Sequence, residues 1–288
     1  MAERIVFLNG DYLPESRASL PVFDRGLLFA DAVYEGFGIL DGQIVDFIYH
    51  MDRLEQSLTK LNIPITFTTD GMFHDLMRLI AENNAENGFL YLHITRGAGD
   101  RAFPYQGDYQ PNMFAFTQGE KFSADAPPPV IDLATYPDLR WARRDIKSTN
   151  LLAQVMAKHA AAEANAYEAL MIDDDGYVTE AGSSSFFYIR DSALYVRPVS
   201  NEILHGITRQ TMLRVAAERQ IKIVERIYHL DEVMAADEAL ITASSIYVLP
   251  VGRIDGHTIG DGKAGKFTLA LREGYIAKAR AEFYLPDS

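Results

Sequence analysis

Three consecutive prolines, Pro127–Pro129, interrupt the chain less than halfway along its 288 residues. Proline lacks a backbone N–H and has a fixed φ, so the run can continue neither a helix nor a central strand. The stretch GEKFSADAPPPV that contains it is mostly small or polar, which is typical of a linker. We therefore predict a first domain over residues 1–118, an interdomain linker over 119–129 and a second domain over 130–288.

The first part of the chain mixes strand and helix patterns. RIVFLNGDYLPE and DAVYEGFGILDGQIVDF each predict two strands around a turn, and FLYLHIT and NMFAFTQ predict two more. IYHMDRLEQSLTKLNI and GMFHDLMRLIAENN predict helices, because their apolar residues recur at helical spacing.

The second part mixes the same two patterns. Strands are predicted over VIDLATY, EALMI, YVTEA, SSFFYI, ALYVRP, IKIVERI, ALITAS and YVLPVGRID. Helices are predicted from about Asn150, over GITRQTMLRVAAERQ, over LDEVMAADE and at the C-terminus. The fold class is therefore α/β (α+β), with two mixed domains and a ligand cleft expected between them.

Composition excludes several classes of function. The net charge of −13 argues against a nucleic-acid partner, because phosphates call for a basic protein face. The absence of cysteine excludes disulfides and thiolate metal sites, and we predict no metal. The N-terminus lacks a signal-peptide pattern and no apolar run reaches about 18 residues, so we predict a cytoplasmic protein without a membrane partner.

The acidic charge also constrains any site for an anionic ligand. Local arginines, backbone N–H groups and helix N-termini must hold such a ligand against the overall field. The segment ILHGITRQTM opens a predicted helix at Gly206–Thr208, where free N–H groups and a hydroxyl form an anion site. Taken alone, the segment is merely a capped helix start.

Lys147 stands in an unusual place, between a predicted strand and a predicted helix in the stretch DIKSTNLL. An ordinary interpretation is a surface lysine whose ammonium stays in water. A lysine desolvated at a domain boundary would instead have a lowered pKa and act as a nucleophile toward carbonyls.

Two further stretches carry charges that fit the same chemistry. Glu180 lies at a predicted strand end before an Ala-Gly-Ser-Ser-Ser turn, whose small residues allow a flat ring to approach the backbone. Arg53 lies on the polar side of a predicted helix in HMDRL. Each also has an ordinary interpretation, a polar turn for the first and a solvated helix face for the second.

Together these stretches resemble the fold-type IV family of pyridoxal-phosphate enzymes, the class IV aminotransferases. The resemblance runs through DRGLLFADAVYEG, HMDRLEQS, DIKSTNLL, VTEAGSSS, GITRQ and LITASSIYVLPV in the order and spacing of the family. It implies a small N-terminal α/β domain, a larger C-terminal pseudo-barrel domain, pyridoxal 5′-phosphate (PLP) as cofactor, and a homodimer.

The resemblance also assigns roles to individual residues. Lys147 is the expected Schiff-base lysine, and Glu180 the expected partner of the pyridine nitrogen. Leu204 is expected to pack against the ring. The cofactor phosphate is expected to bind four residues: Arg53, Ile207, Thr208 and Ser244. The expected substrate-binding residues are Tyr34, Tyr91, His93, Arg101 and Ser245.

The substrate is predicted from the same comparison of motifs. Arg101-Ala102-Phe103 occupies the place where D-amino-acid aminotransferases carry Arg-x-His, with the arginine kept and the histidine lost. Tyr91-Leu92-His93 occupies the place of the Tyr-x-Arg of branched-chain enzymes and lacks its arginine. We therefore predict a D-amino-acid aminotransferase that acts on amino acids and 2-oxo acids, with 2-oxoglutarate or pyruvate as acceptor.

Other functions remain open from the sequence. An (R)-selective amine transaminase fits Phe103, and a branched-chain L-amino-acid aminotransferase shares the fold. GDGKAGKFT, from Gly260, nearly matches a phosphate-binding loop, although Phe267 replaces its Ser or Thr. A non-catalytic relative is disfavoured by the presence of both Lys147 and Glu180.

Overall fold

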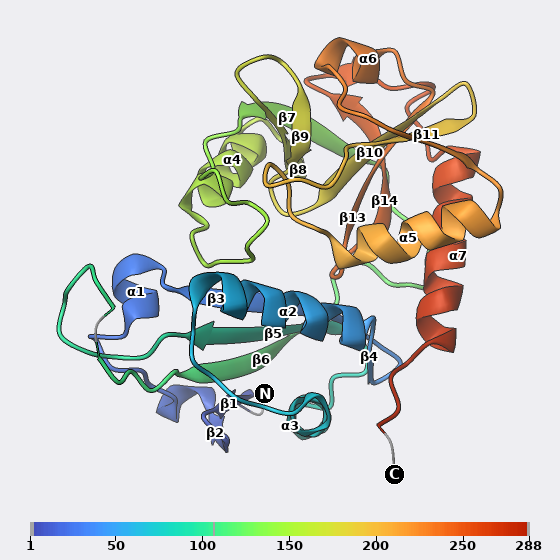
Figure 1. The fold of residues 1–288 in the computed structure, drawn as a ribbon. Coiled ribbons are helices and arrows are strands. Elements are labelled where there is room, and N and C mark those ends of the chain that lie inside the picture. The colour runs from blue at the N-terminus through green and yellow to red at the C-terminus, as the bar shows by residue number, and fades with distance from the viewer. Residues whose placement is uncertain (1–2, 106, 287–288) are drawn as a thin grey trace. The chain divides into compact units, whose positions relative to one another are not determined.

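A computed structural model describes residues 3–105 and 107–286, and these form two compact units (Figure 1). The first unit contains the described residues up to Lys121, the short segment Ile146–Asn150 and the described residues from Glu282. The second contains Phe122–Asp145 and Leu151–Ala281. Lys147 therefore belongs to the first unit, although it follows the linker in sequence. The linear boundaries at 118 and 129 stay a prediction.

The first unit is built on an antiparallel sheet in the order β2-β1-β6-β5-β3-β4. Its strands are β1 (Ile5–Leu8), β2 (Asp11–Pro14), β3 (Ala32–Leu40), β4 (Gln43–Ile44), β5 (Gly88–Thr95) and β6 (Met113–Gly119). The predicted Asn-Gly and Asp-Gly hairpins are confirmed, because Asn9, Gly10, Asp41 and Gly42 all have positive φ. Two consecutive positive φ values give a turn whose twist matches the flanking strands.

The two faces of this sheet differ in burial. Residues such as Phe37, Leu90 and Leu92 are fully buried and alternate with half-buried aromatic residues on the other face. Helix α2 (Phe47–Leu61) packs along β3, and α3 (Thr69–Glu82) packs against β1 and β6 (Figure 1). Both helices were predicted from their apolar spacing.

Two short helices of the first unit were not predicted. They are the 3-10 helix η1 (Glu15–Arg17) and α1 (Arg25–Phe29). Neither is long enough to show a helical repeat of apolar residues, since one repeat needs about two turns. Helix α1 is instead fixed by its cap, because the Asp24 side chain accepts a hydrogen bond from Gly26 N–H at 2.7 Å.

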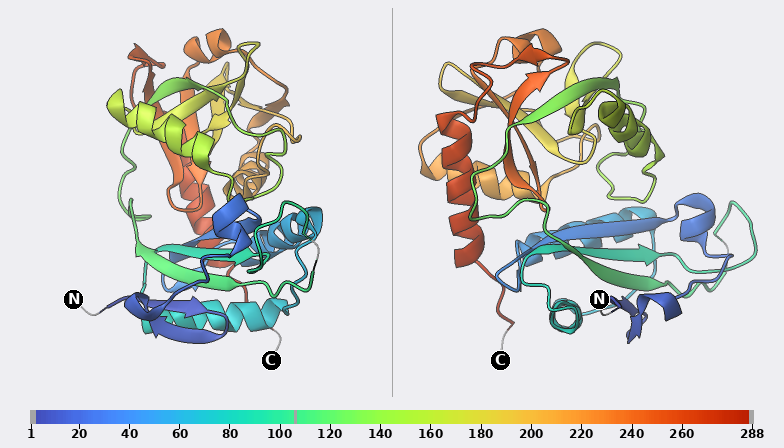
Figure 2. Two further views of the ribbon diagram at one scale, coloured as in Figure 1. Left: turned by 90° about the vertical axis from the view of Figure 1, so that its left-hand side faces the viewer. Right: turned by 180° about the vertical axis from the view of Figure 1, so that it is seen from behind.

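The second unit is built on a curled sheet that forms an open half-barrel (Figures 1 and 2). Its strands follow the order β12-β11-β10-β13-β14-β7-β8-β9, and β15 pairs with β14. They are β7 (Ile131–Pro137), β8 (Glu168–Ile172), β9 (Val178–Ala181), β10 (Ser185–Arg190), β11 (Ala193–Val196), β12 (Lys222–Glu225), β13 (Glu238–Ala243), β14 (Tyr247–Ile254) and β15 (His257–Thr258). The predicted pseudo-barrel is confirmed, and only the short β15 was missed.

Helices cover this sheet from several directions. Helix α4 (Leu152–Glu163) packs on β7 and β8, and α6 (Leu230–Met234) is short. Helices α5 (Ile207–Glu218) and α7 (Lys266–Ala281) lie side by side, and α7 packs on β14 (Figures 1 and 2). The main core includes Leu170, Phe186, Tyr228, Ile241 and Leu249.

Candidate functional site

Backbone hydrogen bonds hold Lys147 in place within the first unit. Tyr34 N–H donates to the Lys147 carbonyl at 3.0 Å, and Lys147 N–H donates to Ser57 Oγ at 3.2 Å. Thr149 N–H donates to the Ala32 carbonyl at 3.1 Å. The half-buried side chain places its Nζ 4.3 Å from the Tyr34 ring centroid. Hydrogen bonds thus fix the backbone of Lys147, and its amine lies beside an aromatic ring on a side chain that is only half-buried.

Arg53 of α2 is buried and ion-paired, so the solvated-face interpretation was wrong. Its side chain is 8% exposed. Its Nε and Nη2 bind the two oxygens of Glu35 at 2.8 and 2.7 Å. His50 Nδ1 lies 2.7 Å from the same carboxylate. This bidentate pair fixes the guanidinium plane, which suits a group that must meet a phosphate in one orientation.

The Glu35 carboxylate stays ionised despite complete burial. Burial alone would raise its pKa, but Arg53 and His50 outweigh that effect and lower the pKa to about 2. Glu35 was not assigned a role from the sequence. The available signal was a carboxylate inside the apolar strand pattern AVYEGFGIL, because a buried charge needs a partner.

The half-buried face of the first sheet carries an aromatic layer. Tyr34 stacks on Tyr91 with ring centroids 5.4 Å apart, and Tyr91 hydroxyl and His93 Nδ1 share a hydrogen bond of 3.0 Å. His93 in turn stacks on Phe114 at 4.5 Å. Burial lowers the pKa of His93 to about 4 and is only partly opposed by Asp24, so His93 is neutral near pH 7. Three predicted substrate residues therefore lie on one uncharged face.

His93 should make the protein less stable in mild acid. Between about pH 6.5 and 4 the unfolded chain binds a proton at this histidine and the folded chain does not, so stability falls as pH falls. Within this range, each pH unit of acidification lowers the free energy of unfolding by about 1.4 kcal/mol. Urea unfolding at several pH values should show a shallower decline for His93→Gln than for the unsubstituted protein. His50, whose burial also lowers its pKa, remains in both proteins, so equal declines would contradict this account.

Arg101 lies exposed in the connection between β5 and β6. Its Cζ is 5.3 Å from the Phe29 ring centroid and 5.4 Å from that of Phe103. Within the described part of the chain, no carboxylate forms an ion pair with Arg101. Aromatic faces hold a guanidinium without using its N–H donors. The N–H donors of Arg101 can therefore bind a substrate carboxylate.

In the second unit, Glu180 lies at the end of β9 and is 6% exposed. Its Oε1 accepts hydrogen bonds from Leu204 N–H at 3.1 Å and from Arg140 Nη1. Arg140 also binds Asp138 at 2.7 and 2.9 Å. Among the described residues, both hydrogen bonds of Glu180 fall on Oε1, so Oε2 is left for a ring N–H. The sequence analysis assigned no role to Arg140 or Asp138. The only sequence signal available for them was their position just after β7.

The start of α5 has the properties of an anion site. Ile207 and Thr208 are each 2% exposed, and Gly206 provides no side-chain cap, so buried N–H groups there need an acceptor. A Cβ on Gly206 would lie 2.6 Å from Ser185 Oγ, so any larger residue there would require the serine side chain to move. Ser244 and Ser245 lie in the turn between β13 and β14 of the same unit. These residues fit the phosphate of PLP.

The glycine-rich stretch before α7 does not form a phosphate site. The Glu238 carboxylate accepts hydrogen bonds from the N–H groups of Phe267 and Thr268 at 3.1 and 2.8 Å. A protein carboxylate thus occupies the place that a nucleotide phosphate would need and would repel it.

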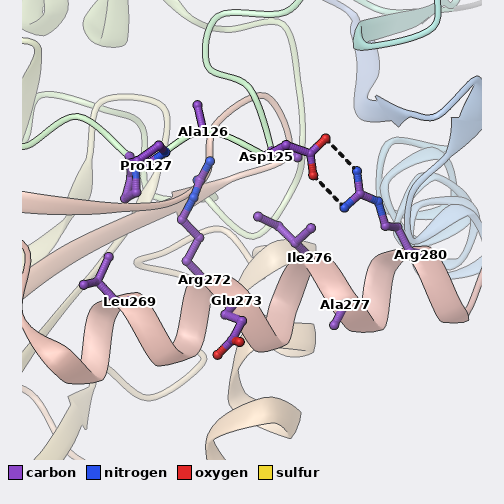
Figure 3. Close-up of a pocket in the computed structure, with 11 residues that line it drawn as sticks. Asp125, Ala126, Pro127, Leu269, Arg272, Glu273, Ile276, Ala277 and Arg280 are labelled. Carbon is purple, nitrogen blue, oxygen red and sulfur yellow. Dashed lines mark hydrogen bonds and ion pairs between the residues drawn. The ribbon is translucent and has the colours of Figure 1, made fainter.

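A groove of about 460 Å³ in the second unit lies between residues 124–128 and α7 (Figure 3). Arg280 forms two hydrogen bonds to Asp125 there, at 2.9 and 3.0 Å. Arg272 donates to the carbonyls of Val248 and Ser123 at 3.1 and 2.8 Å. None of the predicted site residues lines this groove, so it is not the candidate active site.

Comparisons with known proteins identify the family to which the chain is similar. The model of the family described as amino-transferase class IV matches residues 32–254. The D-alanine aminotransferase of Staphylococcus haemolyticus is 35% identical over 272 residues, covering 94% of this chain and 96% of that protein. The D-alanine aminotransferase of Bacillus licheniformis is 36% identical over 263 residues, covering 91% and 93%.

Solved structures of branched-chain amino acid aminotransferases share the fold. The Escherichia coli enzyme aligns with a TM-score of 0.88 at 21% identity, covering 98% of this chain and 97% of that one. The Thermobaculum terrenum enzyme in its PLP form aligns with a TM-score of 0.85 at 24% identity, covering 97% and 94%. Separately, no helix within residues 3–105 and 107–286 is both long and apolar enough to cross a membrane.

Proposed function

The chain belongs to the class IV aminotransferases, which use PLP, and we propose that it moves the amino group of a D-amino acid to a 2-oxo acid. The observation that carries the substrate class is Arg101. Its guanidinium rests on the rings of Phe29 and Phe103 and keeps its donors for an α-carboxylate. The D-alanine aminotransferases among its relatives support the same choice.

In the first unit, Arg53 is proposed as a ligand of the cofactor phosphate. In the second unit, the N–H groups of Ile207 and Thr208 and the side chain of Ser244 are proposed as phosphate ligands. Leu204 would pack on the ring while its N–H positions Glu180, whose Oε2 would accept a hydrogen bond from the pyridine nitrogen. When bound, PLP withdraws electrons from the bond at the substrate Cα.

Lys147 is proposed to bind the cofactor covalently in the resting enzyme and then to act as a base. Once released by substrate, its Nζ would take a proton from the substrate Cα and return it on the cofactor side. Tyr34 lies next to this amine and would form the substrate side of the site with Tyr91, His93 and Ser245. Pyruvate or 2-oxoglutarate would then accept the amino group in a second half-reaction, which gives ping-pong kinetics.

The proposal is tested by a substrate panel with Arg101→Gln. The unsubstituted enzyme should act on D-alanine or D-glutamate, and the variant should raise KM for these donors on the order of 10- to 100-fold. The expected cause is loss of a bidentate ion pair, because a neutral glutamine amide cannot form one with a carboxylate. Arg190→Gln, an exposed change at the end of β10, is the control. Turnover of L-leucine but not of either D-amino acid would refute the substrate assignment.

An (R)-selective amine transaminase is the second candidate. The uncharged face formed by Tyr34, Tyr91 and neutral His93 favours it, because an amine with an aryl substituent needs no charged partner there. The same panel decides, since such an enzyme would turn over (R)-1-phenylethylamine better than D-alanine. A branched-chain L-amino-acid aminotransferase is favoured only by the shared fold. The homodimer and the cytoplasmic location stay predictions.

A further inference from the structure

The segment that carries Arg101 is held at its base by backbone contacts. We call residues 96–105 the Arg101 arm. Arg25 N–H donates to the Gly97 carbonyl at 2.9 Å, and Gly99 N–H donates to the Phe23 carbonyl at 3.2 Å. A Cβ on Gly97 would lie 2.0 Å from the Gln110 carbonyl oxygen. The backbone at Gln110, which leads into β6, therefore packs directly against the arm at Gly97. These contacts fix only residues up to Gly99.

Beyond Gly99 the arm is held by a buried side chain from α1. Arg25, 3% exposed, donates from Nη1 to the Ala102 carbonyl at 2.6 Å and from Nη2 to the Phe103 carbonyl at 3.2 Å. Its Cζ also lies 4.8 Å from the Phe29 ring centroid. Ala102 and Phe103 directly follow Arg101, so Arg25 fixes the backbone from which the Arg101 side chain extends.

Arg25 is itself oriented by a shared carboxylate. Asp31 Oδ2 accepts from Arg25 Nε at 2.8 Å and from Arg96 Nε at 2.7 Å. Arg96 donates to the carbonyls of Leu61 and Asn62 at the end of α2, each at 2.7 Å, and its Cζ lies 3.9 Å from the Tyr105 ring centroid. The Arg25–Asp31–Arg96 triad therefore joins the arm to helices α1 and α2 of the first unit.

We propose that Arg25 is a positioning residue for substrate binding: by holding the Ala102 and Phe103 carbonyls, it keeps the Arg101 guanidinium over Phe29 and Phe103. The proposal rests on the carboxylate-binding role proposed for Arg101. A flexible arm would have to be ordered each time a substrate bound, and Arg25 removes that entropic cost in advance. Because the buried guanidinium uses Nε, Nη1 and Nη2 for three different oxygens, a lysine cannot reproduce it.

The proposal is tested in the holoenzyme with Arg25→Gln, Arg101→Gln and the double variant. We expect Arg25→Gln to raise KM for D-alanine on the order of 10-fold with kcat little changed. In the Arg101→Gln background the same change should have little further effect, because the residue it positions is gone. A multiplicative effect of the two changes on KM would overturn the proposal, since a merely structural loss acts equally in both backgrounds.

Limited proteolysis gives a second readout that does not depend on activity. Trypsin should cleave after Arg101 on the order of 10-fold faster in Arg25→Gln, because local opening exposes the arm. Arg226→Gln is the matched control, since Arg226 also binds a carboxylate (Glu232, 2.5 Å), a carbonyl and an aromatic ring. Unchanged cleavage in Arg25→Gln would overturn the anchoring role.

One outcome separates this proposal from the function on which it rests. Faster cleavage with an unchanged KM in Arg101→Gln would refute the carboxylate role of Arg101 and leave the anchor supported. Should Arg25→Gln fail to accumulate in folded form, Arg25→Lys keeps the charge beside Asp31 and loses the paired carbonyl contacts. The same KM comparison and the same cleavage assay then apply, with the same expected direction.

Discussion

Replacing Lys147 with alanine is expected to reduce kcat for amino transfer by about 10⁴-fold or more. The change would remove the amine that is proposed both to bond to the cofactor aldehyde and to move the Cα proton. The fold should survive, because the fixed part of this residue is its backbone, through bonds to Tyr34 and Ser57. Initial rates with D-alanine and pyruvate, at saturating PLP, measure the effect.

Lys278→Ala is the matched control for this experiment. Lys278 is also partly buried, with its side chain 16% exposed and its Nζ bound to Glu218 at 2.7 Å. It lies on α7, an element that carries none of the residues assigned to the site. We expect the control to keep its activity. A Lys147→Ala enzyme as active as the control would contradict the assignment of the lysine.

Replacing Glu180 with glutamine is expected to lower kcat on the order of 10²- to 10⁴-fold. A carboxylate beside the pyridine nitrogen favours its protonated form, and a neutral amide does not, so the cofactor would withdraw electrons less strongly. Arg140 would keep its contacts with Asp138, so the second unit should lose stability without unfolding. Steady-state kinetics combined with the visible absorbance of bound PLP separate loss of chemistry from loss of cofactor.

Glu180→Asp and Glu202→Gln complete that comparison. Aspartate keeps the charge and should restore part of kcat. Glu202 also pairs with an arginine, Arg197 at 2.6 Å, but its side chain is 59% exposed, so its substitution should leave kcat unchanged. If Glu180→Gln and Glu202→Gln have equal kcat, Glu180 does not act on the ring nitrogen.

Much of the fold could be predicted because its signals are local. Asn9-Gly10 and Asp41-Gly42 define hairpins within four residues, and the apolar spacing of α2 and α3 needs only their own sequence. The association of residues 146–150 with the first unit could not be predicted this way. It depends on contacts such as the hydrogen bond that Tyr34 N–H, more than 100 residues earlier in the chain, donates to the Lys147 carbonyl.

Prediction of the site was limited in the same way, because local sequence patterns do not show contacts between distant residues. Motif resemblance assigned roles to Lys147 and Glu180, which stay predictions. Helical spacing placed Arg53 on a solvated face, although it is buried against Glu35. The partner lies on another element, and spacing within one helix carries no information about it. Arg140 and Arg25 escaped prediction for the same reason, because each acts through contacts with residues distant in sequence.

The covalent bond between Lys147 and PLP is the claim on which the account depends, and borohydride reduction tests it most directly. The purified holoenzyme would be reduced, digested and mapped by mass spectrometry, with Lys147→Ala carried through in parallel. The account predicts loss of the visible absorbance band and a phosphopyridoxyl group on the peptide that contains Lys147, with no such peptide from the variant. A phosphopyridoxyl group on a different lysine, or none in an active holoenzyme, would contradict it.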